Sequence, residues 1–459
     1  MIMNPVIFRE YDIRGVVNKD FDAEFAYHLG GAYISLTKAK LGLKSNPTIC
    51  IGQDARHSSP ALVERLAQGM ADSGAQVRLL GLVTTPVTYF STFALKDVHG
   101  AIMVTGSHNP PEYNGFKISV GTSTIFGEDI KELGRIIEGQ DAGAITQGGS
   151  VESFDILPLY VDRYVQEFGS LKQIPVVLDC GNGAAGSVAR RMYEAVGLTP
   201  KILFEEPDGR FPNHHPDPTV EENLVDLKRA VKETNSIIGI GFDGDADRIG
   251  VVDERGKMIL GDEIIALCSR FILQERPGDK IIGDVKCSDR MYNYIAKYGG
   301  QPIMWKTGHS LVKQKIKDEK APFGGELSGH IFFADRNYGY DDALYAGLRV
   351  IEILAKTGKS LGQLLADLPT AYNTPEIRID TTEEKKHSIV KAIKEHFAEK
   401  EDGIEVNLID GIRVSFPYGW ALARASNTQP VLVLRFEADS EENLKTIRSR
   451  FERVVNPLL

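Results

Sequence analysis

Short apolar runs alternate with longer amphipathic segments along nearly the whole chain, and this alternation restricts the fold more than any other feature of the sequence. The apolar runs that predict strands include residues 48–52, 77–83, 175–179 and 280–285. The amphipathic segments that predict helices include residues 60–74, 221–234, 262–274 and 342–355. Strands that alternate with helices pack as α/β layers, so we expect an α/β fold. A chain of 459 residues exceeds what one hydrophobic core supports, which predicts several domains.

Domain boundaries are expected where the composition changes. Residues 140–149 are rich in Gly and small residues without periodicity, which predicts a linker and a boundary near residue 152. In the last part of the chain, expected strands at 376–380, 406–416 and 431–438 accompany helices at 383–399 and 441–455. We therefore expect three similar mixed α/β domains and a smaller α+β domain around a central cleft, at residues 1–152, 153–255, 256–369 and 370–459.

Charge and cysteine usage exclude several classes of protein. The formal net charge of −10 argues against general binding to nucleic acid. No apolar run approaches the length that crosses a bilayer, and residues 1–9 lack the basic and apolar segments of a signal peptide. The cysteines at 50, 180, 268 and 287 are far apart, which predicts buried thiols rather than a zinc site or disulfides. We expect a cytoplasmic monomer without nucleic-acid or membrane partners.

Three aspartates occupy alternate positions after the apolar run 237–242, in the sequence Asp-Gly-Asp-Ala-Asp-Arg at 243–248. Three neighbouring carboxylates would repel strongly without a cation, and their oxygens suit Mg²⁺, Mn²⁺ or Ca²⁺. An EF-hand loop has the same spacing, but Arg248 occupies the position where its turn requires Gly, and strands rather than helices are expected on both sides. A solvated acidic turn without metal is the other alternative. The pattern favours a catalytic metal loop and points to phosphate chemistry.

A second loop, Thr-Gly-Ser-His-Asn-Pro at 105–110, follows the predicted strand that ends near residue 105. Side chains at such strand ends protrude on the side of the sheet where α/β proteins usually bind ligands, which makes Ser107 a candidate nucleophile. A plain turn is the alternative, because these residue types cluster in turns. The loop is not a hydrolase nucleophile elbow, since Thr105 and Asn109 stand where that motif requires glycines.

Together the two loops resemble the phosphoserine and metal loops of the α-D-phosphohexomutases. Glu-Leu-Ser-Gly-His at 326–330 resembles that family's sugar-binding loop, and Arg-Ala-Ser-Asn-Thr at 424–428 resembles its phosphate-binding loop. The resemblance runs from Tyr-Asp-Ile-Arg-Gly at 11–15 to the final helix and is greatest for bacterial phosphomannomutase/phosphoglucomutase. The chain departs from the family pattern at two positions: Ala246 stands where the metal loop commonly has Gly, and Leu327 stands where the sugar-binding loop often has Met. Neither change removes a residue that would bind the metal or the sugar.

The resemblance implies that phosphorylated Ser107 passes its phosphoryl group to a hexose phosphate, giving a hexose 1,6-bisphosphate that turns round and returns the other phosphate. One Mg²⁺ per chain would be bound by Ser107, Asp243, Asp245 and Asp247. Fixed cations should neutralise the transferred group, and a general base must take the hydroxyl proton. The candidate cations are Arg14, Lys117 and Arg248; the candidate bases are His108, Lys117 and His330.

Substrate contacts are also implied by the resemblance. Glu326, Ser328 and His309 would bind the sugar 3- and 4-hydroxyls, and Tyr11 belongs to the same group. The residues expected to hold the phosphate that is not transferred are Arg424, Ser426, Asn427, Thr428 and Lys286. Because glucose and mannose share the 3- and 4-hydroxyls and differ at carbon 2, we expect a site that accepts both.

Other functions remain open from the sequence. A phosphoglucosamine mutase differs chiefly in its last loop, where Ser-Gly-Thr is typical. A metal-dependent phosphatase that uses a phosphoserine would release phosphate to water and would not need a second phosphate-binding loop. A non-catalytic sugar-phosphate binding protein would not need Ser107.

Overall fold

The computed structural model describes residues 1–139, 148–397, 403–426 and 430–459. The predicted linker 140–149 lies largely outside these residues. The first sheet has the strand order β1-β5-β4-β2-β3-β7, with β6 paired to β5. Its strands are β1 (Ile13–Val16), β2 (Thr48–Gln53), β3 (Gln76–Leu82), β4 (Val98–Val104), β5 (Tyr113–Val120), β6 (Ser123–Thr124) and β7 (Ser150–Ser153). The helices around it are α1 (Ala23–Leu41), α2 (Ser59–Asp72), α3 (Thr85–Ala94) and α4 (Glu128–Gly139).

Both faces of the first sheet are buried, because alternate residues of its strands enter different cores. Ile49 and Ile51 of β2 pack with residues of α1, α2 and α4, whereas Cys50 between them packs with residues of α3 and α5. Period-two alternation places successive side chains on opposite faces, so an unbroken apolar run is what a covered sheet requires. The core on the Cys50 side continues into the second and third sheets.

The second sheet has the order β12-β11-β10-β8-β9, and the third has the order β14-β13-β15-β16. In both sheets the parallel pairs lie toward one edge and the antiparallel pairs lie toward the other. The second sheet comprises β8 (Val176–Asp179), β9 (Lys201–Leu203), β10 (Ile238–Phe242), β11 (Ile249–Asp253) and β12 (Met258–Ile259), with α5 (Leu157–Phe168), α6 (Ala189–Ala195) and α7 (Val225–Glu233). The third comprises β13 (Lys280–Asp284), β14 (Gln301–Trp305), β15 (Phe323–Gly325) and β16 (Ile331–Phe333), with α8 (Gly261–Glu275), α9 (Asp289–Lys297), α10 (His309–Glu319), α11 (Ala343–Thr357) and α12 (Leu361–Leu364).

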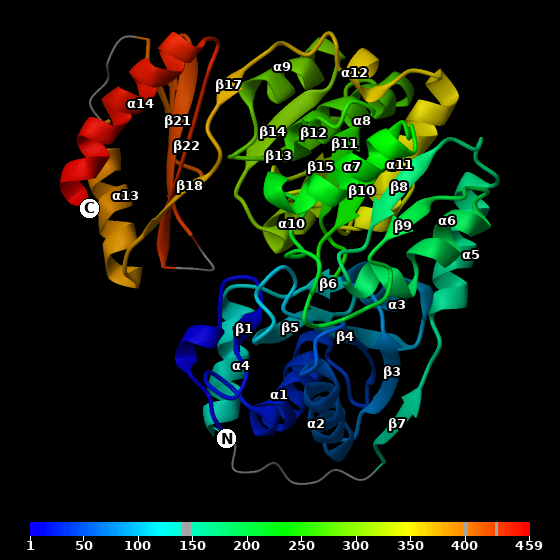
Figure 1. Cartoon of the computed structure of the whole chain (residues 1–459). Helices are drawn as coiled ribbons and strands as arrows, with labels where there is room; N and C mark the ends of the chain where they lie inside the picture. Colours follow the sequence, from blue (N-terminus) through cyan, green and yellow to red (C-terminus); the bar gives the residue numbers. More distant parts are fainter. Residues whose placement is uncertain (140–147, 398–402, 427–429) are drawn as a thin grey trace.

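The fourth sheet is antiparallel and lies beside the third domain, with α13 and α14 on its outer face (Figure 1). Its elements are β17 (Tyr372–Asn373), β18 (Ile377–Asp380), β19 (Glu405–Asn407), β20 (Ile412–Phe416), β21 (Gly419–Ala425), β22 (Val431–Ala438), α13 (Glu383–His396) and α14 (Glu441–Val455). Ala421 and Ala423 of β21 pack in the core that includes α13 and α14, whereas Trp420 and Leu422 pack against Val285 of the third domain. Strand alternation thus gives this small sheet an interdomain face.

Most elements expected from the sequence are present, although the helix predicted at 221–234 begins as a 3₁₀ turn before α7. The strand β21 was missed because its apolar residues are interrupted by Arg424 and preceded by Gly419. β7 pairs with β3 and β12 pairs with β11, so the first and second sheets extend to Ser153 and Ile259. The domain boundaries given above remain predictions. All four cysteines are buried free thiols, as expected. Among the described helices, none is both long enough and apolar enough to cross a membrane.

Candidate active site

Several of the predicted site residues lie in loops that leave the carboxyl ends of strands, where open α/β sheets usually bind ligands, whereas Arg14, Lys117 and Arg424 lie on strands β1, β5 and β21. β4 leads into the Ser107 loop, β10 into the aspartate loop, and β15 into the loop 326–330. Lys286 follows β13, and Ser426 follows β21. The fold therefore brings together loops that are distant in the sequence.

Ser107 is buried and lies beside the aspartate loop, with its Oγ donating a hydrogen bond to Asp243 Oδ2 at 2.8 Å. Its Oγ also lies 3.2 Å from Nδ1 of His108. The backbone of Ser107 has φ +50°, in the left-handed region that non-glycine residues adopt only at a cost of about 1–3 kcal/mol. Strain of this kind persists only where surrounding contacts enforce it, and here it aims the hydroxyl at Asp243.

Arg56 supplies those contacts. Its buried guanidinium donates hydrogen bonds to the carbonyl oxygens of Ser107, Asn109, Pro110 and Tyr113, at 2.5–2.9 Å. Asp54 receives the Arg56 Nε–H at 3.1 Å and the Thr105 hydroxyl at 2.8 Å. Both residues were missed in the sequence, where the only signal was a charged Gln-Asp-Ala-Arg stretch directly after the strand at 48–52.

Asp243, Asp245 and Asp247 are fully buried, and each offers an oxygen within 4.8 Å of the others. The loop is held by its own backbone, since Asp243 Oδ1 accepts the N–H groups of Asp247 and Arg248 at 3.1 Å. β10 and β11 flank the loop, so the EF-hand alternative is wrong: that motif requires helices on both sides.

Lys117 of β5 balances part of this charge. Its Nζ lies 2.7 Å from Asp245 Oδ2 and also donates to Asp247 Oδ2. Burial alone would lower the pKa of Lys117, but the aspartates raise it above its ordinary value, so the side chain is a cation in this arrangement. Thr85, at the start of α3, donates its hydroxyl to Asp245 Oδ2 at 2.6 Å.

The remaining oxygens of the loop fit a hard cation such as Mg²⁺. Asp245 Oδ1 and Asp247 Oδ1 are buried and have no hydrogen-bond partner among the described residues. Burial and the two neighbouring carboxylates raise the pKa of Asp243 well above its ordinary value, which reflects the cost of placing its negative charge here. A divalent cation would satisfy the unpartnered oxygens and remove the repulsion.

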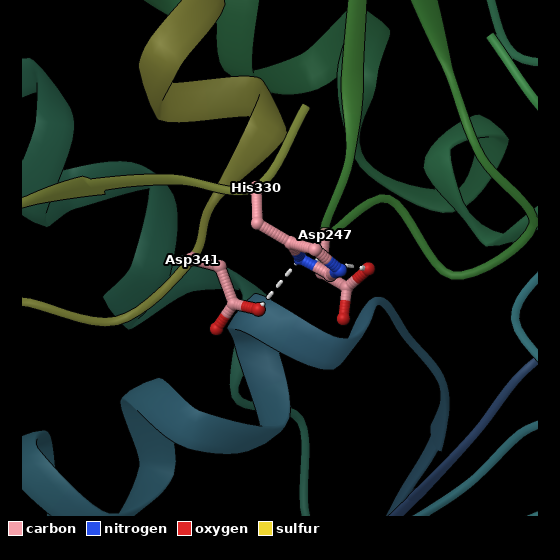
Figure 2. Close-up of side chains that lie close together, drawn as sticks. All are labelled: Asp247, His330 and Asp341. Atoms are coloured by element: carbon pink, nitrogen blue, oxygen red, sulfur yellow. Dashed lines mark ion pairs between the residues drawn. The ribbon is translucent and has the colours of Figure 1, made fainter. Parts of the chain in front are cut away.

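A second group of side chains lies next to the aspartates and contains His330, Asp247 and Asp341 (Figure 2). Arg248 Nε donates a hydrogen bond to His330 Nε2 at 2.9 Å. On the other side of the ring, His330 Nδ1 lies 2.9 Å from Asp341 Oδ2. Lys313 donates to Asp341 Oδ1 at 3.0 Å, so this second group already contains cations and is less suited to a metal than the aspartate loop.

The residues expected to bind the sugar hydroxyls are close together. Glu326 accepts a hydrogen bond from the N–H of Gly308 at 2.7 Å and from the hydroxyl of Ser328 at 2.8 Å. The His309 ring stacks on His330 with 5.4 Å between ring centroids, and the Tyr11 ring packs edge-on against His309 at 6.0 Å. The Tyr11 segment thus reaches the third domain, where its hydroxyl donates to the carbonyl of Thr307 at 2.6 Å.

Arg14 is hydrogen-bonded to the Ser107 loop rather than to the aspartate loop. Its Nη1 donates to Asn109 Oδ1 at 2.8 Å, and its Nη2 donates to Asp12 Oδ2 at 2.5 Å. The guanidinium is therefore held near Ser107, where the sequence predicted a cation.

Lys286 of the third domain and two arginines of the fourth domain form a positive cluster. Lys286 lies 3.3 Å from Glu376 Oε1, and Arg424 donates to Asp410 Oδ2 at 3.0 Å. Burial raises the pKa of Glu376, but the charges of Lys286, Arg378 and Arg424 outweigh it and bring that pKa down to about 2. Three cations around one carboxylate can hold a dianion, as predicted for Lys286 and Arg424. Arg378 was missed because it lies on a plain alternating strand.

The remaining predicted phosphate-binding residues are only partly described. Ser426 is buried at the end of β21, and its carbonyl accepts a hydrogen bond from Lys386 at 2.6 Å. Asn427 and Thr428 lie outside the described residues.

Gly244 controls the approach of the two central loops. A Cβ at this position would meet the carbonyl oxygen of Ser107 at 2.3 Å, well inside contact distance. We expect Gly244→Ala to separate the Ser107 and aspartate loops and to lower kcat by about 10²-fold, since displacement of reacting groups by about 1 Å has effects of this size. Steady-state kinetics would measure this loss.

Gly139→Ala is the matched control, because a Cβ there meets nothing within 4 Å. A folded Gly244→Ala protein with wild-type kcat would contradict the steric role of this glycine.

Comparison with known proteins agrees with this geometry. The models of the phosphoglucomutase/phosphomannomutase family match the chain in four parts: α/β/α domain I at residues 5–143, domain II at 158–256, domain III at 260–372 and the C-terminal domain at 376–454. The chain belongs to this family. The resemblance to the α-D-phosphohexomutases and the expected four-domain α/β fold are confirmed, and the protein is a mutase, an enzyme of the isomerase class.

Relatives match over nearly the full length of this phosphohexomutase. Phosphomannomutase/phosphoglucomutase of Pseudomonas aeruginosa is 46% identical over 445 residues, covering 97% of this chain and 94% of the relative. Phosphoglucomutase of Neisseria gonorrhoeae is 43% identical over 457 residues, covering 99% and 98%. A crystal structure of a family protein from Burkholderia thailandensis has a TM-score of 0.91 and 42% identity, covering 100% of this chain and 98% of that one.

Proposed function

We propose that this mutase interconverts hexose 1-phosphates and hexose 6-phosphates, of glucose, mannose or both, through a phosphoserine at Ser107 and a hexose 1,6-bisphosphate intermediate. The observation that carries the proposal is the Ser107 hydroxyl, 2.8 Å from Asp243 in a buried aspartate loop with two unpartnered oxygens. A phosphate on that hydroxyl would be dianionic and would need the cation that the loop fits. When bound by Asp243, Asp245, Asp247 and the phosphoserine, Mg²⁺ would neutralise charge on the phosphoryl group.

The chain's own residues would align the transfer. The bond between phosphorus and Ser107 Oγ breaks, a bond to a sugar hydroxyl oxygen forms, and the hydroxyl proton passes to a base. After the bisphosphate turns round, the same steps run in reverse from its other phosphate to Ser107. Lys117, Arg248 and Arg14 supply positive charge on the sides of the site nearest Ser107 and the aspartates.

The base is best assigned to His330 among the three candidates. Lys117 carries a proton in this arrangement because the aspartates raise its pKa. Burial, together with the charge of Arg248, lowers the pKa of His108 well below its ordinary value, which makes it a weak base. His330 lies beside Asp247, and its Nε2 lone pair, which accepts the Arg248 Nε–H in this arrangement, would become available when a bound phosphate attracts Arg248 away.

Binding would fix the sugar at both ends. Glu326, Ser328 and His309 offer acceptors and donors to adjacent hydroxyls, while the cluster of Lys286, Arg378 and Arg424 attracts the phosphate that is not transferred. The same two subsites would serve both orientations of the bisphosphate, so a dianion-binding cluster separate from the aspartates favours a mutase over a phosphatase.

The experiment that tests the proposal compares three substrates. Glucose, mannose and glucosamine 1-phosphates are each incubated with the protein, Mg²⁺ and a trace of hexose 1,6-bisphosphate as activator, and both 6-phosphate and inorganic phosphate are measured. We expect glucose and mannose phosphates to react at comparable rates, because they share the 3- and 4-hydroxyls. A rate for one epimer thousands of times below the other would overturn dual specificity; preference for glucosamine 1-phosphate would identify a phosphoglucosamine mutase, and net phosphate release a phosphatase.

We further propose that the enzyme acts as a cytoplasmic monomer.

A further inference from the structure

His330 lies between Arg248 and Asp341, and these two neighbours require one ring nitrogen to accept a hydrogen bond and the other to donate one. Arg248 Nε can only donate, and it donates to His330 Nε2 at 2.9 Å, so Nε2 must be an acceptor. A neutral imidazole with an accepting Nε2 carries its proton on Nδ1. That proton needs an acceptor, because His330 is only 3% exposed.

Asp341 is placed to be that acceptor. Its Oδ2 lies 2.9 Å from His330 Nδ1, and both atoms are buried and have no hydrogen-bond partner among the described residues, so each lacks a partner that the other could supply. Asp247 is the alternative carboxylate, but its Oδ1 is 3.7 Å from Nδ1 (Figure 2). Asp247 is also one of the proposed metal ligands, which leaves Asp341 as the nearer carboxylate and the one that is not assigned to the metal.

Backbone pairing fixes the positions of these groups. His330 forms a β-bridge with Arg248, and Asp341 forms a β-bridge with Phe332, two residues after His330. The backbones of His330, Arg248 and Asp341 are therefore linked by neighbouring β-bridges. On its far side Asp341 receives the Lys313 ammonium at 3.0 Å, which keeps the carboxylate charged and limits its rotation.

We propose that Asp341 is a positioning residue for phosphoryl transfer: it accepts the Nδ1–H of His330, holds the ring in place and leaves Nε2 as the nitrogen that takes the substrate proton. This inference rests on the proposed mutase function. Arg248 covers Nε2 in the present arrangement, and its guanidinium is the group that a phosphate would attract away. Asp341 touches neither Glu326, Ser328 nor the phosphate cluster in any described contact, although its Oδ2 lies 3.8 Å from Nδ1 of His309 in the sugar-binding group.

The decisive variant is Asp341→Asn. An asparagine amide can donate to Nδ1, which favours the wrong tautomer with a proton on Nε2, and that proton would oppose Arg248. We expect kcat to fall by about 10²–10⁴-fold, the range for loss of general base catalysis, with KM for the hexose phosphate little changed. Asp335→Asn is the matched control, because Asp335 is a largely buried carboxylate that binds Arg349 at 2.6 Å and lies outside the site; its kcat should stay at the wild-type value.

A second measurement reads the tautomer directly and does not depend on activity. Long-range ¹H–¹⁵N spectra of histidine-labelled wild-type protein distinguish protonated from unprotonated ring nitrogens, and His330→Gln identifies the His330 signal among the ten histidines. We expect a protonated Nδ1 and a bare Nε2 in the wild type, and a shift toward protonated Nε2 in Asp341→Asn.

Three results would overturn the proposal: a folded Asp341→Asn protein with wild-type kcat, a variant whose loss lies only in KM and melting temperature, or a wild-type His330 protonated on Nε2. If Asp341→Asn does not fold, the wild-type ¹H–¹⁵N spectrum alone tests the proposal, by showing whether Nδ1 or Nε2 of His330 is protonated. A wild-type protein without mutase activity would instead contradict the proposed function. The ¹H–¹⁵N spectrum would still show which nitrogen of His330 carries the proton.

Discussion

Replacing Ser107 by alanine should abolish isomerisation, with a loss in kcat of about 10⁴-fold or more, as for other enzymes that lose a covalent nucleophile. The hydroxyl is the only atom of this side chain that could carry the phosphoryl group, and no neighbouring hydroxyl among the described residues replaces its contact with Asp243. Conversion of glucose 1-phosphate to glucose 6-phosphate would measure the loss. Label transfer from hexose 1,6-[³²P]bisphosphate to the protein should disappear in parallel.

Ser123→Ala is the control for this prediction, because Ser123 lies in the same domain and its hydroxyl bonds only to Lys317 at 3.3 Å in a described contact. Full activity is expected there. The phosphoserine pathway would be wrong if Ser107→Ala isomerised at the wild-type rate, or if protein phosphorylated at Ser107 failed to transfer the group to any hexose monophosphate with Mg²⁺ present.

Removal of divalent cations should have an effect of comparable size. Charge neutralisation by a bound metal contributes several kcal/mol to such transfers, so we expect dialysis against EDTA to lower kcat by about 10³-fold or more and Mg²⁺ to restore it. The metal should also raise the melting temperature, because it binds the folded aspartate loop and not the unfolded chain. Asp245→Asn should remove both effects, whereas Asp97→Asn, an exposed carboxylate paired with Arg78, should keep them.

The pH dependence of metal binding follows from Asp243. Burial and the neighbouring Asp245 and Asp247 raise its pKa well above 3.8, so a proton occupies this ligand to higher pH than in an ordinary aspartate. Protons and metal compete for the same carboxylate, and Mg²⁺ affinity should therefore rise with pH through that raised pKa and fall as the pH is lowered. Calorimetric titration at several pH values would test this; an affinity that stays constant or falls as the pH rises would contradict it.

The sequence predicted those parts of the site that are local. Alternating apolar and amphipathic segments predicted strands at 175–179 and 280–285, which correspond to β8 and β13. The aspartate triplet was recognisable because three like charges within five residues require a counter-charge wherever they lie. Four loops in family order were enough for the family, because each loop is a short segment whose residues act together.

Partners that are distant in the chain could not be found in this way. Thr85 bonds to Asp245 across 160 positions, and Arg56 supports the Ser107 loop across 51 positions. Neither lies in a motif, and a single Thr or Arg is common on any surface. Asp341 was missed for the same reason, since it precedes the helix α11 as an ordinary acidic residue beside the capping Asp342.

By itself the sequence determined the layered α/β class, the family and the chemistry of the loops, because periodicity and short motifs are properties of neighbouring residues. The tertiary structure alone decided which groups meet: that Lys117 pairs with two of the aspartates, that Gly244 lets Ser107 approach them, and that Asp341 rather than Asp247 is the nearer partner of His330. Electrostatic and steric interactions depend on distances of a few ångströms, and those distances are set by how the sheets pack.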